Sequence, residues 1–101
     1  MKKFLQVVVL ATLTMTSLET VFADAAAGKA KSALCMACHG ANGISSNDIW
    51  PNLAGQKRGY LVKQIKAFRD GGRVDMMMAP MVKSLTDDDI DNLSDYYSEL
   101  K

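Results

Sequence analysis

Histidine and cysteine are scarce in this chain: the sequence contains one histidine, His39, and two cysteines, Cys35 and Cys38. A structural zinc site takes four ligands in a closed tetrahedron, so zinc here would need a carboxylate or a second chain. Two cysteines are also too few for a disulfide-rich secreted scaffold. Any thiol or imidazole chemistry must therefore use these three residues.

Strand patterns and an excess of one charge are also absent. No segment alternates apolar and polar residues with the period of two that a half-buried strand requires, and we find no internal repeat or linker. Twelve Lys and Arg residues balance eleven Asp and Glu residues, which excludes the net-basic footprint of a nucleic-acid-binding domain. Basic residues gather in 57–83 and acidic residues in 84–101, and we interpret these as two solvated helix faces. The sequence predicts an all-α protein.

The apolar run near the N-terminus is too short to cross a membrane. It covers Phe4–Leu13, whereas a spanning helix needs about 20 such residues. Two lysines precede it, a polar stretch follows it, and Ala23 ends a segment suited to cleavage. This order is typical of a secretory signal peptide. We therefore predict a cleavable signal peptide over 1–23, export to the periplasm, and one domain over 24–101.

The pentapeptide Cys35–His39 holds two cysteines three residues apart, followed at once by the histidine. That spacing is typical of an attachment site for c-type haem. Residues i and i+3 share a helix face, so both sulfurs can reach one edge of a porphyrin while His39 binds the iron. The alternatives are a thioredoxin-like dithiol, a zinc site and a structural disulfide. The dithiol motif belongs to a βαβ pattern that this chain lacks, zinc lacks ligands, and a disulfide leaves His39 unexplained.

Apolar periodicity and breaking residues divide the domain into helices and loops. In chain order we predict a helix over 25–37, a loop over 40–56, a helix over 60–70, a Met-rich segment over 74–85 broken by Pro80, and a last helix after Thr86. Asp24 and Thr86 are the expected N-caps, and Gly71-Gly72 should end the second helix. The last helix is expected to bury a stripe of Ile90, Leu93, Tyr97 and Leu100, flanked by Tyr96.

A second axial ligand must be another residue type, because the only histidine is used. The segment Met76–Met81 contains four methionines, and a thioether sulfur is a soft ligand that suits haem iron and raises its reduction potential. Methionines are ordinarily core filler, so composition alone leaves packing and ligation both open. The position of the cluster in a predicted loop favours ligation.

Over nearly all of 24–101 the chain resembles the class I cytochromes c. It looks most like the small soluble monohaem cytochromes c of bacteria (cytochrome c-553-like) and like one half of the related dihaem forms. The resemblance rests on the segments Cys35 to Gly40, Trp50 to Gln56, Tyr60 to Gln64 and Met78 to Ile90.

This resemblance implies a role for particular residues. Cys35 and Cys38 would bind haem c covalently, with His39 and Met78 as the axial iron ligands. Met78 stands in the family's position, seven residues before the leucine that precedes the last helix. The chain departs from the family in its surplus of methionines, and Met81 is the runner-up to Met78.

Two further contacts are implied by the same resemblance. The Pro51 carbonyl would accept a hydrogen bond from the Nδ1–H group of His39, which would fix the ring. The first and last helices would cross where Gly28 meets an aromatic residue, either Tyr96 or Tyr97.

The implied fold is a single-domain class I cytochrome c, three to four helices wrapped around one covalently attached haem. The implied function is a periplasmic one-electron carrier, not an enzyme, serving a membrane quinol-oxidising complex, a terminal oxidase or a periplasmic dehydrogenase. We expect a monomer, no nucleic acid, and no stable membrane insertion after signal cleavage. Two alternatives stay open: a haem enzyme subunit or gas sensor with a displaceable Met ligand, and a non-haem dithiol or zinc-binding module.

Overall fold

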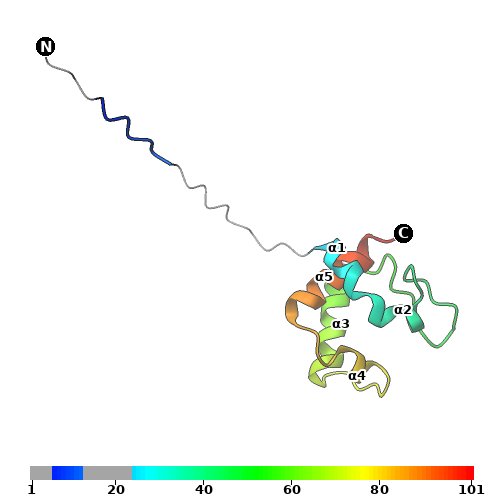
Figure 1. The fold of residues 1–101 in the computed structure, drawn as a ribbon. Helices are drawn as coiled ribbons and strands as arrows, with labels where there is room; N and C mark the ends of the chain where they lie inside the picture. The colour runs from blue at the N-terminus through cyan, green and yellow to red at the C-terminus, as the bar shows by residue number, and fades with distance from the viewer. Residues whose placement is uncertain (1–5, 13–23) are drawn as a thin grey trace, which may run out of the picture.

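A computed structural model describes residues 6–12 and 24–101, and all regular secondary structure within them is helical. The five helices are α1 (Ala25–Lys31), α2 (Ala33–His39), α3 (Arg58–Asp70), α4 (Met78–Val82) and α5 (Asp87–Glu99) (Figure 1). The predicted all-α class is confirmed. Residues 6–12 form neither helix nor strand, and the rest of the predicted signal peptide lies outside the described residues. None of the described helices is long and apolar enough to cross a membrane.

The first predicted helix is divided into two at Ser32, so a continuous helix over 25–37 is wrong. Asp24 caps α1 as expected, because its carboxylate accepts from the N–H groups of Ala26 at 2.8 Å and Ala27 at 3.3 Å. At Ser32 the hydroxyl donates to the Lys29 carbonyl at 2.6 Å, and the backbone ψ of −11° departs from the ordinary helical value. Serine competes with helical bonding in this way. The break lets α2 leave α1 in a new direction.

Helices α1 and α5 cross at one end of the domain, as Figure 1 shows. Gly28 is buried at the crossing, and a Cβ there would overlap the Asn92 carbonyl and lie 2.9 Å from the Cβ of Tyr96. The Asp24 N–H donates to the Asn92 side-chain oxygen at 2.8 Å, which adds a second contact between the same helices. The expected meeting of a glycine and an aromatic residue is therefore present with Tyr96.

The core lies between α3, α4 and α5. Its buried hydrophobic side chains are Leu61, Val82, Leu85, Ile90, Leu93 and Tyr97, while Leu100 is partly buried. The predicted stripe of the last helix thus faces inward. Helix α3 begins two residues earlier than predicted and ends as expected at Gly71, whose φ of 86° is left-handed.

The Met-rich segment is not wholly a loop, because Met78 to Val82 form α4. Pro80 does not break this helix. It stands in the first turn, where the missing proline N–H is not needed for helical hydrogen bonding. Helix α4 packs against the far end of α3 (Figure 1), and its residue Val82 is buried in the core. The interpretation of 76–81 as a loop is therefore corrected.

The basic and acidic segments are not simply two solvated faces. Arg58 of α3 pairs with Asp95 of α5 at 2.5 Å and with Asp91 at 3.7 Å. Arg69 pairs with Asp87 at 2.8 Å, and it also donates to the Leu85 carbonyl at 3.1 Å. Arginines of α3 thus neutralise carboxylates of α5. Solvent-accessible pairs of this kind add little to the free energy of unfolding.

A capping box at the start of α5 gives a first testable prediction. The Thr86 hydroxyl accepts from the Asp89 N–H at 3.1 Å, and the Asp89 carboxylate accepts from the Thr86 N–H at 3.0 Å. Thr86→Ala should lower the free energy of unfolding of the holoprotein by about 1 kcal/mol, because one orphan N–H loses its partner. Thr86→Ser keeps an acceptor and is the control. Equal losses in denaturant titrations of the two variants would contradict the capping role.

The other half of the box depends on pH. The Thr86 N–H lowers the pKa of Asp89 below its ordinary value in the folded protein. A carboxylate with a depressed folded pKa contributes stability that is complete above the unfolded pKa and is lost as pH falls through the folded pKa. The contribution of Asp89 should therefore be constant above about pH 5 and fade under more acidic conditions.

Candidate haem site

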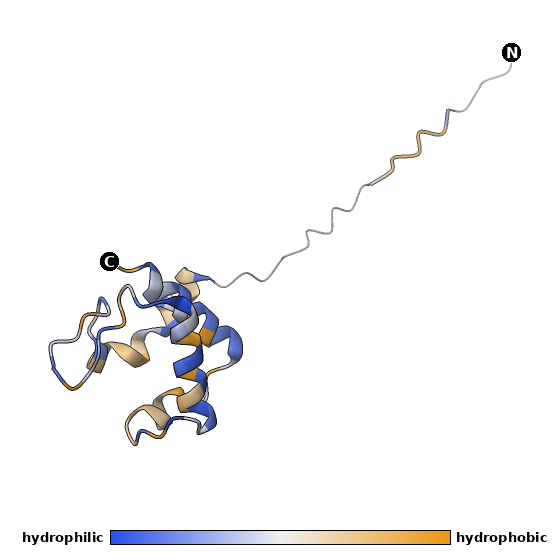
Figure 2. Ribbon diagram, turned by 180° about the vertical axis from the view of Figure 1, so that it is seen from behind, coloured by the Kyte–Doolittle hydropathy of each residue, from blue (hydrophilic) through white to orange (hydrophobic). Residues whose placement is uncertain are grey.

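A pocket of about 470 Å³ lies between α2, α3, α4 and the loop after α2. Its lining is mostly apolar, and Leu93 and Tyr97 of α5 contribute to it. Figure 2 shows that α2 and α4, which face this pocket, are among the more hydrophobic elements. A volume of this size falls within the range of about 300–1,000 Å³ that is common for ligand and cofactor sites.

Helix α2 brings the predicted attachment residues to one side of the pocket. Cys35, Cys38 and His39 all line it, and neither cysteine is in a disulfide. His39 is only 6% exposed. Burial raises the pKa of the Cys35 thiol, because a thiolate would lose its hydration there. Two half-buried thiols and a buried imidazole therefore share one wall.

The His39 ring is held by the loop that follows α2. Its Nδ1 atom lies 2.7 Å from the Pro51 carbonyl oxygen, so the hydrogen bond implied by the resemblance is present. A carbonyl only accepts, and Nδ1 must therefore carry the proton. The other ring nitrogen, Nε2, then keeps its lone pair free to bind a metal.

The loop reaches His39 because it folds back on itself. The Gly43 carbonyl accepts from the N–H groups of Leu53 at 2.8 Å and Ala54 at 2.9 Å. Gly43 has a φ of 76°, and a Cβ there would crowd the Tyr97 ring at 3.1 Å. These contacts hold the segment containing Pro51 across the end of α2. Backbone hydrogen bonds to Gly43, together with the bond from the Ser45 N–H to the Asn52 side-chain oxygen at 2.7 Å, thus hold the loop around the Pro51 carbonyl.

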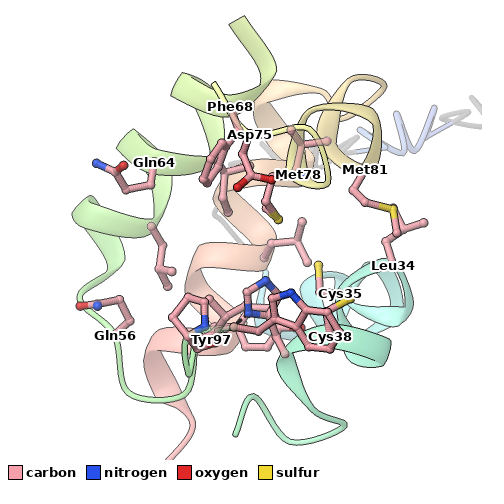
Figure 3. A pocket seen from close by; sticks show the side chains of 18 of the residues that line it. Leu34, Cys35, Cys38, Gln56, Gln64, Phe68, Asp75, Met78, Met81 and Tyr97 are labelled. Atoms are coloured by element: carbon pink, nitrogen blue, oxygen red, sulfur yellow. Dashed lines mark hydrogen bonds between the residues drawn. The ribbon is translucent and has the colours of Figure 1, made fainter. Parts of the chain in front are cut away.

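Three of the four candidate methionines line the pocket. Met76 does not, and it is 93% exposed. Met77 and Met81 line the pocket but are 55% and 44% exposed, whereas Met78 is half-buried. In Figure 3 the Met78 sulfur points into the pocket toward the side that carries Cys35, and the Met81 sulfur lies near Leu34. Geometry therefore favours Met78 over the other three.

Several pocket residues were not expected from the sequence. Leu34 and Ile49 line the pocket although they are 43% and 75% exposed, and Asp75 lines it beside Met78. A usable signal existed for Asp75, because an aspartate three residues before Met78 is suited to capping the turn. Leu34 and Ile49 follow no periodic pattern that identifies a lining residue.

The residues present fit a covalently attached haem. The pocket combines an apolar lining, two thiols three residues apart, an imidazole with a fixed tautomer and a thioether on another helix. The Tyr97 hydroxyl is buried beside the Cys35 thiol. Nitrogen and sulfur donors of this kind suit haem iron. The class of protein that this fold and site define is a c-type haem protein.

Comparisons with known proteins agree with that class. The family model described as cytochrome c matches residues 25–101. Cytochrome c4 of Pseudomonas aeruginosa is 43% identical over 97 residues, which cover 96% of this chain and 48% of that protein. Cytochrome c-554(548) of Halomonas halodenitrificans is 47% identical over 78 residues, which cover 74% of this chain and 94% of that protein. The chain belongs to the cytochrome c family.

The fold comparison gives the same answer. A crystal structure of reduced cytochrome c4 from Pseudomonas stutzeri is similar with a TM-score of 0.66 and 32% identity, covering 79% of this chain and 51% of that one. The chain spans about half the length of the cytochrome c4 relatives that it matches. Membership of the family means that the chain carries a covalently bound haem c, which sets aside the zinc and dithiol alternatives.

Proposed function

We propose that this protein is a periplasmic one-electron carrier, with Cys35 and Cys38 holding the haem and His39 and Met78 as its axial ligands. The observation that carries the proposal is the convergence of these four side chains on one mostly apolar pocket from two helices. When bound, the haem supplies an iron that changes oxidation state by a single electron. The protein determines where that iron sits, what surrounds it and which ligands it keeps.

His39 acts as the rigid ligand in this proposal. The bond from Nδ1 to the Pro51 carbonyl at 2.7 Å fixes both the tautomer and the ring plane. A hydrogen-bonded imidazole is also a more basic ligand. Because His39 is almost fully buried, water has little access to this side of the site.

Met78 would be the second protein ligand of the iron in this proposal. An iron held by two protein side chains would offer no free position to a substrate or to oxygen, so an enzymatic role is disfavoured. A neutral thioether also favours the reduced state and so raises the reduction potential. Ligands held by packed helices move little between oxidation states, which keeps the barrier to electron transfer low.

The partner would dock at the mouth of the pocket. Leu34, Ile49, Met77 and Met81 line the pocket and are also exposed, so an apolar rim surrounds the place where an electron would enter or leave. A carrier must dissociate quickly, and its contact should be small, below about 1,200 Å². Partners of suitable chemistry are a membrane quinol-oxidising complex, a terminal oxidase or a periplasmic dehydrogenase.

The proposal is tested by adding carbon monoxide to the reduced holoprotein and cyanide to the oxidised holoprotein. A carrier with two protein ligands should leave both absorption spectra unchanged while still accepting one electron per haem in a reductive titration. Rapid binding of either molecule at low concentration would instead favour the gas sensor or the enzyme subunit.

The choice of Met78 is a separate prediction. Met78→Ala should abolish the weak near-infrared sulfur-to-iron band, admit carbon monoxide, and lower the reduction potential by about 100 mV or more, a fraction of the range of about 0.8 V that axial ligands span. Met81→Ala is the matched control, because Met81 also belongs to α4 and lines the pocket. If Met81→Ala loses the band and Met78→Ala keeps it, the ligand lies one turn further along α4.

A further inference from the structure

The turn that leads into α4 is organised by one carboxylate. The Asp75 Oδ1 atom accepts from the N–H groups of Met77 at 2.8 Å and Met78 at 2.9 Å. The Asp75 backbone carbonyl accepts from the Ala79 N–H at 3.0 Å. Asp75 therefore accepts hydrogen bonds from three successive N–H groups. They belong to Met77, to the proposed ligand Met78 and to Ala79.

Little packing fixes the residues just before Met78, although Met78 itself is partly buried against the core. Val74 and Met76, which flank Asp75, are 90% and 93% exposed, so they contribute almost no packing. Helix α4 packs chiefly against α3, and its one buried side chain is Val82, four residues beyond Met78. The backbone before Met78 thus depends on short-range hydrogen bonds for its conformation.

The carboxylate is well suited to this role. Hydrogen bonds from N–H groups to an ionised acceptor are stronger than neutral ones, and one Asp75 carboxylate oxygen accepts from both Met77 and Met78. Asp75 also lines the pocket, and Figure 3 shows its carboxylate close to the Met78 side chain. Asp75 therefore contacts the backbone of Met78 and also lines the pocket that the Met78 sulfur enters.

We propose that Asp75 is a positioning residue: its carboxylate fixes the backbone of Met77 and Met78 so that the Met78 sulfur stays directed into the pocket. This inference rests on the proposed ligation by Met78. A thioether is a neutral, weak ligand, and its hold on iron depends on how firmly the protein presents it. Without the Asp75 acceptor, the two N–H groups would turn to water, and the turn could sample conformations that withdraw the sulfur.

The test is the affinity of the oxidised holoprotein for added imidazole, which must displace the sulfur to bind. Asp75→Ala should raise that affinity about tenfold, equivalent to about 1.4 kcal/mol, and weaken the near-infrared band. Asp75→Asn keeps a side-chain oxygen that can accept both bonds, and its affinity should stay within about threefold of the wild type. Asp88→Ala, which removes an exposed carboxylate of α5 that does not line the pocket, controls for the change in charge.

The variant Met78→Ala distinguishes a failure of this inference from a failure of the proposed ligation by Met78. If Met78→Ala raises the imidazole affinity but Asp75→Ala does not, Met78 stands as the ligand and the role of Asp75 is overturned. Wild-type affinity in Met78→Ala would overturn the ligand assignment itself. If Asp75→Asn raises the imidazole affinity as much as Asp75→Ala does, hydrogen-bond acceptance by this side chain does not hold the turn, and the inference fails. If Asp75→Ala gives no holoprotein, Asp75→Ser, which has a shorter acceptor, is measured instead. Its imidazole affinity should be about threefold higher than that of the wild type, and an unchanged affinity would overturn the inference.

Discussion

Replacing both Cys35 and Cys38 with serine should yield essentially no haem-bearing protein. The two cysteines are the only ones in the chain, so no other thiol can form a thioether. When bound, the haem would also fill much of the pocket between the helices. Without the haem, the mostly apolar pocket of about 470 Å³ would be open to water, and the side chains around it would lose the apolar body that they pack against.

The measurement is the haem that remains with the polypeptide after acid–acetone extraction, compared with total expressed protein. Cys35→Ser and Cys38→Ser singly should each lower the yield strongly, because each removes one covalent link. Met36→Ser is the matched control: Met36 lies between the two cysteines, is exposed and does not line the pocket, so this variant should keep its haem. Red protein at normal yield from the double variant would refute covalent attachment at these residues.

Gly28→Ala should destabilise the folded protein by about 3 kcal/mol or more. The added Cβ would overlap the Asn92 carbonyl, which is backbone and cannot rotate away, and would press on Tyr96. Overpacking in a core typically costs about 1–3 kcal/mol, and a clash with backbone belongs at the upper end of that range. The α1–α5 crossing must open, which for a domain of this size corresponds to a fall in Tm of about 12 °C or more.

Gly59→Ala is the matched control for this measurement. Gly59 lies in the first turn of α3, and a Cβ there meets nothing within 4 Å. Alanine is the better helix former, so this variant should be neutral or more stable by up to about 1 kcal/mol. A thermal melt of the Gly28→Ala holoprotein within about 2 °C of the wild type would mean that the two helices do not cross this closely.

Signals that act over a few residues could be predicted from the sequence. The N-caps at Thr86 and Asp24 and the helix end at Gly71 are all present where the sequence predicts them. Each depends on a side chain or a φ angle that acts within a single turn, so contacts with distant residues have little effect on where the helix begins or ends. The Cys35–His39 pentapeptide is a local signal of the same kind, because about one helical turn places both thiols and the imidazole on the same wall of the pocket.

Other local features were misjudged because two local preferences competed. The alanine-rich segment favours a continuous helix, yet the Ser32 hydroxyl bonds the Lys29 carbonyl and the chain turns there. Pro80 is ordinarily a helix breaker, yet α4 begins only two residues before it. Its effect depends on where the helix starts, and that start is set by the hydrogen bonds of Asp75.

The sequence by itself determined the all-helical class, the attachment pentapeptide and the order of the motifs, because these follow from composition and from spacing along the chain. Only the tertiary structure decided which methionines line the pocket, that Gly28 meets the Asn92 backbone, and that α3 arginines pair with α5 carboxylates. These contacts join segments far apart in the chain. Their geometry depends on how whole helices pack, and no local pattern encodes that.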